Sequence, residues 1–431
     1  MSGFQVKTDL VNLGALAGVQ ASNALAPLVM FPFLLHALGS EAYAEVVFAE
    51  ALSLLVLTVV AFSFEVTSVP ELVRLREKND QEAISRLFST VLCVRLILFA
   101  VSAIVAIGLY TLVLGGSWTM VSLWMLVPLA YVFQSLWFYL GSEHNAPVGI
   151  VTLVSRVSCV MLVFILVKDE HDGNLVPAVM GTTYLVGGVA AFAYAVHRYR
   201  LRLRAIPLRQ LGRALIDGKE IFAGNIAVSL QRDVNVLILG VAGVPAGSLA
   251  AYSVAEKLSK SLQAVSRPLN QLFFPKVVRA IRDDTAPTRS VARKIARRTV
   301  PQVALMALIL VALTGCYFAV QAFTTILVTY PNIDQITSML AIMAPTVVFG
   351  IVSFMFGLVG LNYLGHRKTF FAIILVTGTT SAAVCFTLSH WIGAYAAALC
   401  YAGAEIASAL LVVYQYNRSS AQKTMPSQAA K

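Results

Sequence analysis

The chain has 431 residues, of which 58% are hydrophobic and only 12% are charged, and its formal net charge is +11. Soluble domains have about 25% charged residues, so this composition excludes a water-soluble globule of this length. The lipid bilayer is the solvent that fits the chain.

Twelve stretches are long and apolar enough to cross a membrane, a requirement of about 20 residues for a helix. They cover approximately residues 11–36, 42–64, 87–110, 118–140, 146–167, 176–197, 218–242, 247–275, 299–327, 338–361, 369–389 and 392–415. Short segments connect them, so no soluble catalytic domain fits, and we expect no enzyme. The sequence predicts an all-α polytopic membrane protein with about 12 transmembrane helices.

The basic residues predict the orientation of these helices. Of the 32 Lys and Arg residues, 25 lie in the termini or in the even-numbered connections, and the odd-numbered connections contain one, Lys168. Cytoplasmic connections are rich in Lys and Arg, so both termini are expected in the cytoplasm. This placement also explains the net charge through contact with anionic lipid headgroups, and we expect no nucleic acid partner.

The longest basic connection runs from about His197 to Lys219 and divides the twelve stretches into six and six. We therefore predict an N-terminal six-helix lobe over residues 1–205 and a C-terminal six-helix lobe over residues 206–431 with a short cytoplasmic tail. All five cysteines fall inside predicted spans, so we expect no disulfide bond and no metal site.

Charged residues inside the predicted spans are the strongest functional signal. The basic ones are Arg95, Arg156, Arg232, Lys257, Lys260 and Arg267. The acidic ones are Glu50, Asp233 and Glu256, with Glu65 near the end of its span. A cation facing lipid at a helix centre costs about 2.5–3.5 kcal/mol, so these side chains must pair, reach the interface or line water. Their positive excess predicts a solvated cavity for an anion.

Helical periodicity places polar residues of the eighth span on one face. This stripe consists of Glu256, Lys260, Gln263, Arg267, Asn270 and Gln271, with Lys257 at its edge. In the first span, Asn12, Gln20, Asn23 and Pro27 also share a face. We expect a central cationic cavity between the lobes. Two alternatives remain at this point, because the Arg232–Asp233 and Glu256–Lys260 neighbours are also typical of helix–helix pairing, and Arg95 and Arg156 are near enough to span ends to extend to the interface.

Three motifs resemble the Wzx-type O-antigen flippases, the polysaccharide-export branch of the MATE-like superfamily. They are Asn23–Pro27 with Phe31–Gly39, the aromatic stretch Phe133–Gly141, and Ala251–Lys257 followed by Pro268 and Gln271–Lys276. The chain departs from the family pattern at His36, where the family usually has Arg, and at Ala42 and Ala44. The last third of the chain has no matching motif.

The resemblance implies that an oligosaccharide repeat unit on undecaprenyl diphosphate is flipped from the cytoplasmic to the periplasmic leaflet of the bacterial inner membrane by alternating access. No cofactor is implied. The expected substrate-binding residues are Lys260, Arg267, Arg232, Lys257, Arg95, Arg156, Gln263, Asn270 and Asn23. Glu50, Asp233 and Glu256 are expected to couple transport to a proton or sodium gradient, as in an antiporter. The expected partners are the lipid-linked oligosaccharide, the bilayer, H⁺ or Na⁺, and other membrane proteins of polysaccharide assembly.

Two other readings of the sequence stay open. A MATE-like exporter of small molecules has the same architecture, but its cargoes are commonly cationic and would be repelled by a cationic cavity. A polytopic polymerase, ligase or glycosyltransferase usually has a sizeable polar loop with acid and base groups. The only cluster of that kind here, Asp169–Asp172, lies in a short connection where charges are ordinarily solvated.

Overall fold

The computed structural model describes residues 3–282, 289–323, 330–361 and 364–422, and these residues are helical apart from their connections. Within the helices, side chains are described from residue 26 to residue 264 and over most of 295–418. The chain divides into two compact units, Met1–Ser229 and Leu230–Lys431. The predicted boundary between residues 205 and 206 falls in the connection before α9, and the predicted lobes stay a prediction.

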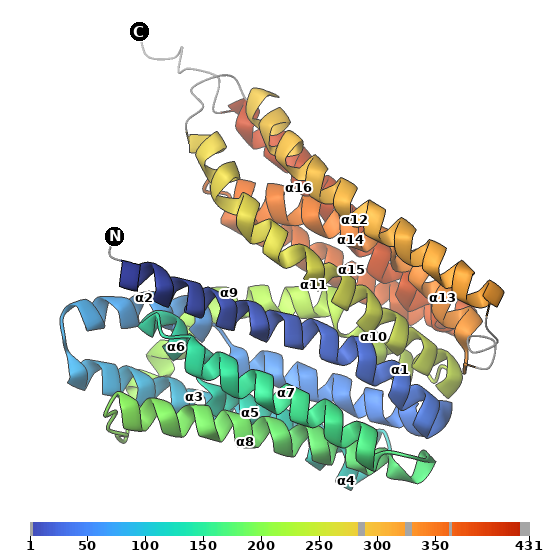
Figure 1. Ribbon diagram of the computed structural model, residues 1–431, viewed down its shortest axis with the longest axis horizontal. Coiled ribbons are helices and arrows are strands. Elements are labelled where there is room, and N and C mark those ends of the chain that lie inside the picture. Colours follow the sequence, from blue (N-terminus) through green and yellow to red (C-terminus); the bar gives the residue numbers. More distant parts are fainter. Residues whose placement is uncertain (1–2, 283–288, 324–329, 362–363, 423–431) are drawn as a thin grey trace. The chain divides into compact units, whose positions relative to one another are not determined.

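The first unit consists of nine α-helices and two short segments of other helical type among its described residues (Figure 1). They are α1 (Gly3–Ala61), α2 (Phe64–Glu77), α3 (Gln81–Gly108), the π-helix Leu109–Val113, α4 (Trp118–Trp124), α5 (Leu126–Gln134), α6 (Leu136–Ser142), α7 (Ala146–Leu166), the 3₁₀-helix Glu170–Asn174, α8 (Leu175–Arg198) and most of α9 (Leu208–Arg232). Helix α8 packs extensively against both α5 and α7.

The second unit contains the remaining elements. They are α10 (Asn235–Val241), α11 (Ala246–Arg282), α12 (Arg289–Phe323), α13 (Ile333–Met343), α14 (Pro345–Ser353), the π-helix Phe354–Leu361, α15 (Arg367–Ile392) and α16 (Tyr395–Gln422). Its apolar core includes Ile295, Met306, Val347 and Tyr416. Helix α16 packs mainly against α14 and α15.

As far as the structure describes them, all twelve predicted windows contain helix, and the described residues contain nine segments that are long and apolar enough to cross a membrane. The two counts differ for identifiable reasons. The first two windows are continuous in α1, and the non-helical Gly39, with φ of 72° and ψ of 174°, separates them into two helices. The windows at α9–α10 and at α11 carry too many polar and charged residues. The prediction of a polytopic all-α membrane protein is confirmed, and the count of twelve stays a prediction.

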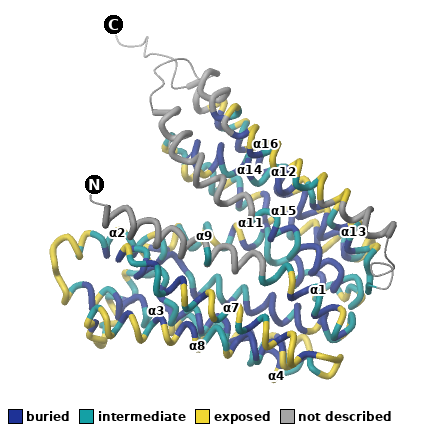
Figure 2. Tube along the Cα trace, in the orientation of Figure 1, coloured by how far each residue is buried: buried dark blue, intermediate teal, exposed yellow. Residues whose placement is uncertain are grey.

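Lipid-facing surface explains the low charge content. Helix α3 exposes Val101, Ile104 and Val105 by 60–72%, a contiguous apolar face that water does not favour. Figure 2 shows exposed residues alternating with buried ones along α7 and α8, as expected for helices that pack on one side and face an apolar solvent on the other.

Breaks in the helices have local causes that also position polar groups. Phe62 adopts a left-handed conformation, with φ of 50°, between α1 and α2. Its carbonyl accepts a hydrogen bond from Asn225 Nδ2 (2.5 Å), and its ring stacks on Phe222 at 4.8 Å. Helix α9 approaches this break closely because residue 218 is glycine, whose Cβ, if present, would lie 2.1 Å from Ser63 Oγ. The first unit therefore holds the start of α2, and with it Glu65, in a fixed place.

Candidate functional site

Charged side chains from four separate parts of the second unit meet in one cluster. Arg232 ends α9, Asp233 lies in the turn that follows, and Glu256 and Lys260 occupy one face of α11 because they are four residues apart. Glu405 on α16 completes the set. We call these five residues the ionic cluster.

Lys260 bridges two carboxylates of the ionic cluster. Its Nζ lies 2.8 Å from Asp233 Oδ1 and 3.0 Å from Glu256 Oε1. Glu256 is only 5% exposed, whereas the side chains of Lys260 and Asp233 are 32% and 38% exposed. The carboxylate of Glu256 is therefore the most buried of these three charged groups, and the side chain of Lys260 remains partly accessible.

Arg232 forms the second ion pair. Its Nε donates to Glu405 Oε1 at 2.6 Å, and its Nη2 donates to Gln263 Oε1 at 3.0 Å. The hydroxyl of Tyr401, a fully buried residue on α16, donates to the same Gln263 oxygen at 3.3 Å. Gln263 and Tyr401 therefore connect α9, α11 and α16 around the guanidinium group.

The first unit encloses Arg95 on α3, which is 1% exposed. Its guanidinium carbon lies 5.0 Å from the centre of the Tyr131 ring and 5.7 Å from that of Phe64. The Tyr131 hydroxyl donates a hydrogen bond to Glu65, whose charge is close enough to act on Arg95. Arg95 is thus held inside the helix bundle and does not extend to the membrane interface.

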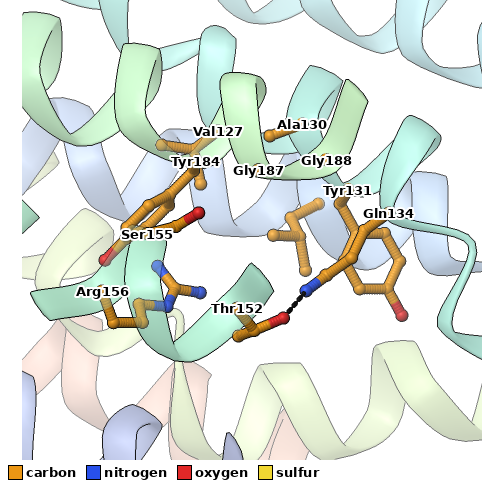
Figure 3. Close-up of a pocket in the computed structure, with 11 residues that line it drawn as sticks. Val127, Ala130, Tyr131, Gln134, Thr152, Ser155, Arg156, Tyr184, Gly187 and Gly188 are labelled. Carbon is orange, nitrogen blue, oxygen red and sulfur yellow. Dashed lines mark hydrogen bonds between the residues drawn. The ribbon is translucent and has the colours of Figure 1, made fainter. Parts of the chain in front are cut away.

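A separate small cavity in the first unit lies beside Arg156 on α7 (Figure 3). The Arg156 guanidinium group stacks on the Tyr184 ring of α8, with 3.4 Å between the guanidinium carbon and the ring centre. Gln134 Nε2 donates to Thr152 Oγ1 at 2.9 Å across the cavity. Tyr131 also lines the cavity, and its ring is the one that lies next to the Arg95 guanidinium group.

The structure brings together five of the predicted site residues: Lys260, Arg232, Gln263, Asp233 and Glu256. The residues expected to bind substrate and those expected to couple ions are therefore direct neighbours. Arg95 and Arg156 lie in different surroundings in the first unit, Glu50 is buried on α1, and Lys257 is half-buried beside Glu256 on α11. The side chains of Arg267, Asn270 and Asn23 lie outside the described residues. The assigned roles stay predictions.

Sequence reasoning missed Glu405 and Tyr401. Glu405 lies inside the last predicted span, 392–415, so counting the charged residues of that span would have found it. It reduces the positive excess inside the membrane and supplies the carboxylate that pairs with Arg232. Tyr401 lies four residues before Glu405 and therefore on the same face of α16. This spacing would have identified Tyr401 once Glu405 was counted.

This fold resembles that of solved polytopic membrane proteins. The chain superimposes on an inward-facing multidrug resistance MATE family transporter of the MOP superfamily with a TM-score of 0.70 and 14% identity, over 97% of this chain and all of that one. It also superimposes on the lipid II flippase MurJ with a TM-score of 0.67 and 11% identity, over 97% of this chain and 88% of that one.

The family is shown by sequence. A family described as "Polysaccharide biosynthesis protein" matches residues 10–281, and the chain belongs to this family, which confirms the predicted resemblance. A relative from Escherichia coli (strain K12), described as "Putative O-antigen transporter", is 26% identical over 268 residues. A relative of the same description from Shigella dysenteriae is 24% identical over 268 residues. The matches cover 62% and 60% of this chain, and 64% and 65% of the length of these relatives.

Proposed function

We propose that the chain flips an undecaprenyl-diphosphate-linked oligosaccharide repeat unit from the cytoplasmic to the periplasmic leaflet by alternating access. The curated relatives are named as O-antigen transporters, and a solved protein of the same fold flips lipid II, another lipid-linked sugar. These names also support the expectation that the chain is not an enzyme. The protein then lies in the bacterial inner membrane with both termini in the cytoplasm, as the distribution of Lys and Arg predicts.

The observation that carries the proposal is the ionic cluster, in which Arg232 and Lys260 keep about a third of their side-chain surface accessible. A diphosphate leaving water for a low-dielectric region needs compensating positive charge. Arg contacts phosphate through two parallel hydrogen bonds, whereas Lys acts as a point charge. The cluster therefore offers both kinds of phosphate contact.

The existing ion pairs of Arg232 and Lys260 offer a way to couple transport to an ion gradient. Asp233, Glu256 and Glu405 must share Arg232 and Lys260 with an arriving diphosphate. Any loss of this pairing changes the affinity of the carboxylates for H⁺ or Na⁺, and linkage makes the effect reciprocal. We propose that Asp233 and Glu256 couple transport to an ion gradient in this way, with Glu50 as a further coupling residue in the first unit.

The proposal is tested by reconstituting the purified protein in vesicles that contain a fluorescent undecaprenyl-diphosphate oligosaccharide. A membrane-impermeant quencher reports how many headgroups reach the outer leaflet. We expect faster exchange between leaflets than in protein-free vesicles and no uptake of a cationic dye such as ethidium. Dye transport without headgroup exchange would instead establish the MATE-like exporter.

A further inference from the structure

The small cavity beside Arg156 is bounded by helices of the first unit, and polar side chains form part of its lining. It lies among α5, α7 and α8, with Leu57 of α1 at its edge, and has a volume of about 50 Å³. Its polar lining residues are Tyr131, Gln134, Thr152, Ser155, Arg156 and Tyr184. Figure 3 shows Arg156, Ser155 and Thr152 on one helix, with the Tyr184 ring over the guanidinium group.

Two glycines fix the width of this cavity. A Cβ on Gly187 would lie 2.0 Å from Ser155 Oγ, and a Cβ on Gly188 would lie 2.4 Å from the carbonyl oxygen of Ala130. Helix α8 therefore packs directly on α7 and α5 at this level. Because main-chain atoms form part of the wall, the cavity cannot widen without moving a helix.

Arg156 presents unused hydrogen-bond donors to the cavity. Its guanidinium face is occupied by Tyr184, but within the described part of the chain its N–H groups have no hydrogen-bond acceptor and no carboxylate partner. The cavity lining contains no acidic residue among the side chains that the structure describes. Thr152 accepts a hydrogen bond from Gln134, so its own O–H is available as a donor.

The cations of the ionic cluster differ from Arg156 in this respect, because Arg232 pairs with Glu405 and Lys260 pairs with Asp233 and Glu256. Arg95 also has buried N–H groups without an acceptor, but it is only 1% exposed and does not line this cavity. The positive charge of Arg156 is therefore available for a group from outside the chain. A guanidinium group with a stacked face and free N–H edges matches the planar, bidentate geometry of a carboxylate.

The cavity volume indicates the size of that group. A water molecule needs about 10–15 Å³ on this measure, so the cavity holds about three or four waters. A carboxylate has three non-hydrogen atoms and fits this space, whereas a diphosphate has nine and does not.

We propose that this cavity binds the carboxylate of an acidic sugar in the transported oligosaccharide, with Arg156 as the bidentate partner and Thr152 as a second donor. The proposal rests on the proposed function and adds to it that the cargo contains a negatively charged sugar. The diphosphate and the sugar carboxylate are then held by different units, the second and the first respectively.

The test is a binding measurement on the purified full-length protein in detergent, using free glucuronate, glucose, inorganic phosphate and pyrophosphate at equal ionic strength. Binding is followed as the shift of the thermal unfolding midpoint with ligand concentration. We expect glucuronate to raise the midpoint and glucose to leave it unchanged. Arg156→Gln should raise the apparent Kd for glucuronate by about tenfold or more, and Arg156→Lys should lie between the two. Lys168→Gln, on an exposed connection, is the matched control and should bind as the parent protein does.

Several outcomes would overturn the inference. One is an equal response to glucose and glucuronate, which indicates a neutral sugar site. Another is a stronger response to inorganic phosphate or pyrophosphate, which indicates a phosphate site. A third is the same glucuronate affinity before and after Arg156→Gln. If that variant does not fold, Thr152→Val removes one donor and should weaken glucuronate binding alone. The assay requires no transport, so a failure here leaves headgroup exchange in vesicles as an independent test of the proposed function.

Discussion

Lys260 Nζ on α11 lies 2.8 Å from Asp233 Oδ1 in the turn after α9, although 27 positions separate the two residues in the sequence. The same ammonium group lies 3.0 Å from Glu256 Oε1. A residue expected to contact cargo is therefore the direct partner of two residues expected to couple ions. Substitutions that change the charge of residue 260 are therefore expected to affect both cargo contact and ion coupling.

Removing the Lys260 ammonium group should destabilise the protein. Lys260→Ala leaves Asp233 and Glu256 without their shared cation, and we expect a loss of about 1–3 kcal/mol in unfolding free energy because the pair is partly accessible to solvent. Thermal unfolding in detergent measures the effect, with Lys168→Ala as the control. An unfolding midpoint equal to that of the parent protein would show that the bridge contributes nothing to stability.

The Arg232–Glu405 pair should show strong energetic coupling. Glu405 is 4% exposed, so Arg232→Gln leaves a buried carboxylate without its cation, and Glu405→Gln leaves the guanidinium group without its acid. We expect each single change to destabilise the protein, and the double change to cost less than their sum by about 0.5–3 kcal/mol. Strictly additive effects on the unfolding midpoint would contradict a direct pair.

Close packing of α8 predicts a strong effect of a single methyl group. Gly188→Ala places a Cβ 2.4 Å from the Ala130 carbonyl oxygen and should cost about 1–3 kcal/mol. Gly212→Ala on α9 is the matched control, because a Cβ there meets no atom within 4 Å. It should be neutral or stabilise the helix by up to about 1 kcal/mol. Similar unfolding midpoints for the two variants would disprove the tight contact.

Tyr131 has two separable roles beside Arg95. Tyr131→Phe removes the hydrogen bond to Glu65 but keeps the ring under the guanidinium group, and should cost about 1–3 kcal/mol. Tyr131→Leu removes the ring as well and should cost about 0.5–2 kcal/mol more, because the cation–π contact is desolvated. If both variants unfold at the same temperature, the ring contributes no stabilisation to Arg95.

The sequence was sufficient to predict the helices and their solvent, because twelve long apolar stretches have few alternatives to spanning a membrane. It also predicted that Glu256, Lys260 and Gln263 share a face, since helical periodicity determines this within one element. The break at Gly39, with φ of 72°, lies in the predicted connection between the windows 11–36 and 42–64.

Partners across helices could not be predicted in the same way. Arg232 was placed beside Asp233 from their adjacency, but its partners are Glu405 and Gln263 on other helices, which only packing brings together. Arg95 was within reach of a span end by sequence distance, yet the structure encloses it between Phe64 and Tyr131. Periodicity gives the face of a helix, and tertiary packing decides what that face meets.

In the proposed function, the ionic cluster binds the anionic lipid-linked headgroup while it crosses the bilayer. The most direct test is the initial rate of headgroup exchange in vesicles for Lys260→Ala and Arg232→Ala, compared with Lys168→Ala at equal amounts of folded protein. We predict that both cluster variants lose at least about tenfold in rate, which corresponds to about 1.4 kcal/mol, while the control exchanges headgroups at the parent rate. Parent rates in folded Lys260→Ala and Arg232→Ala would contradict the claim.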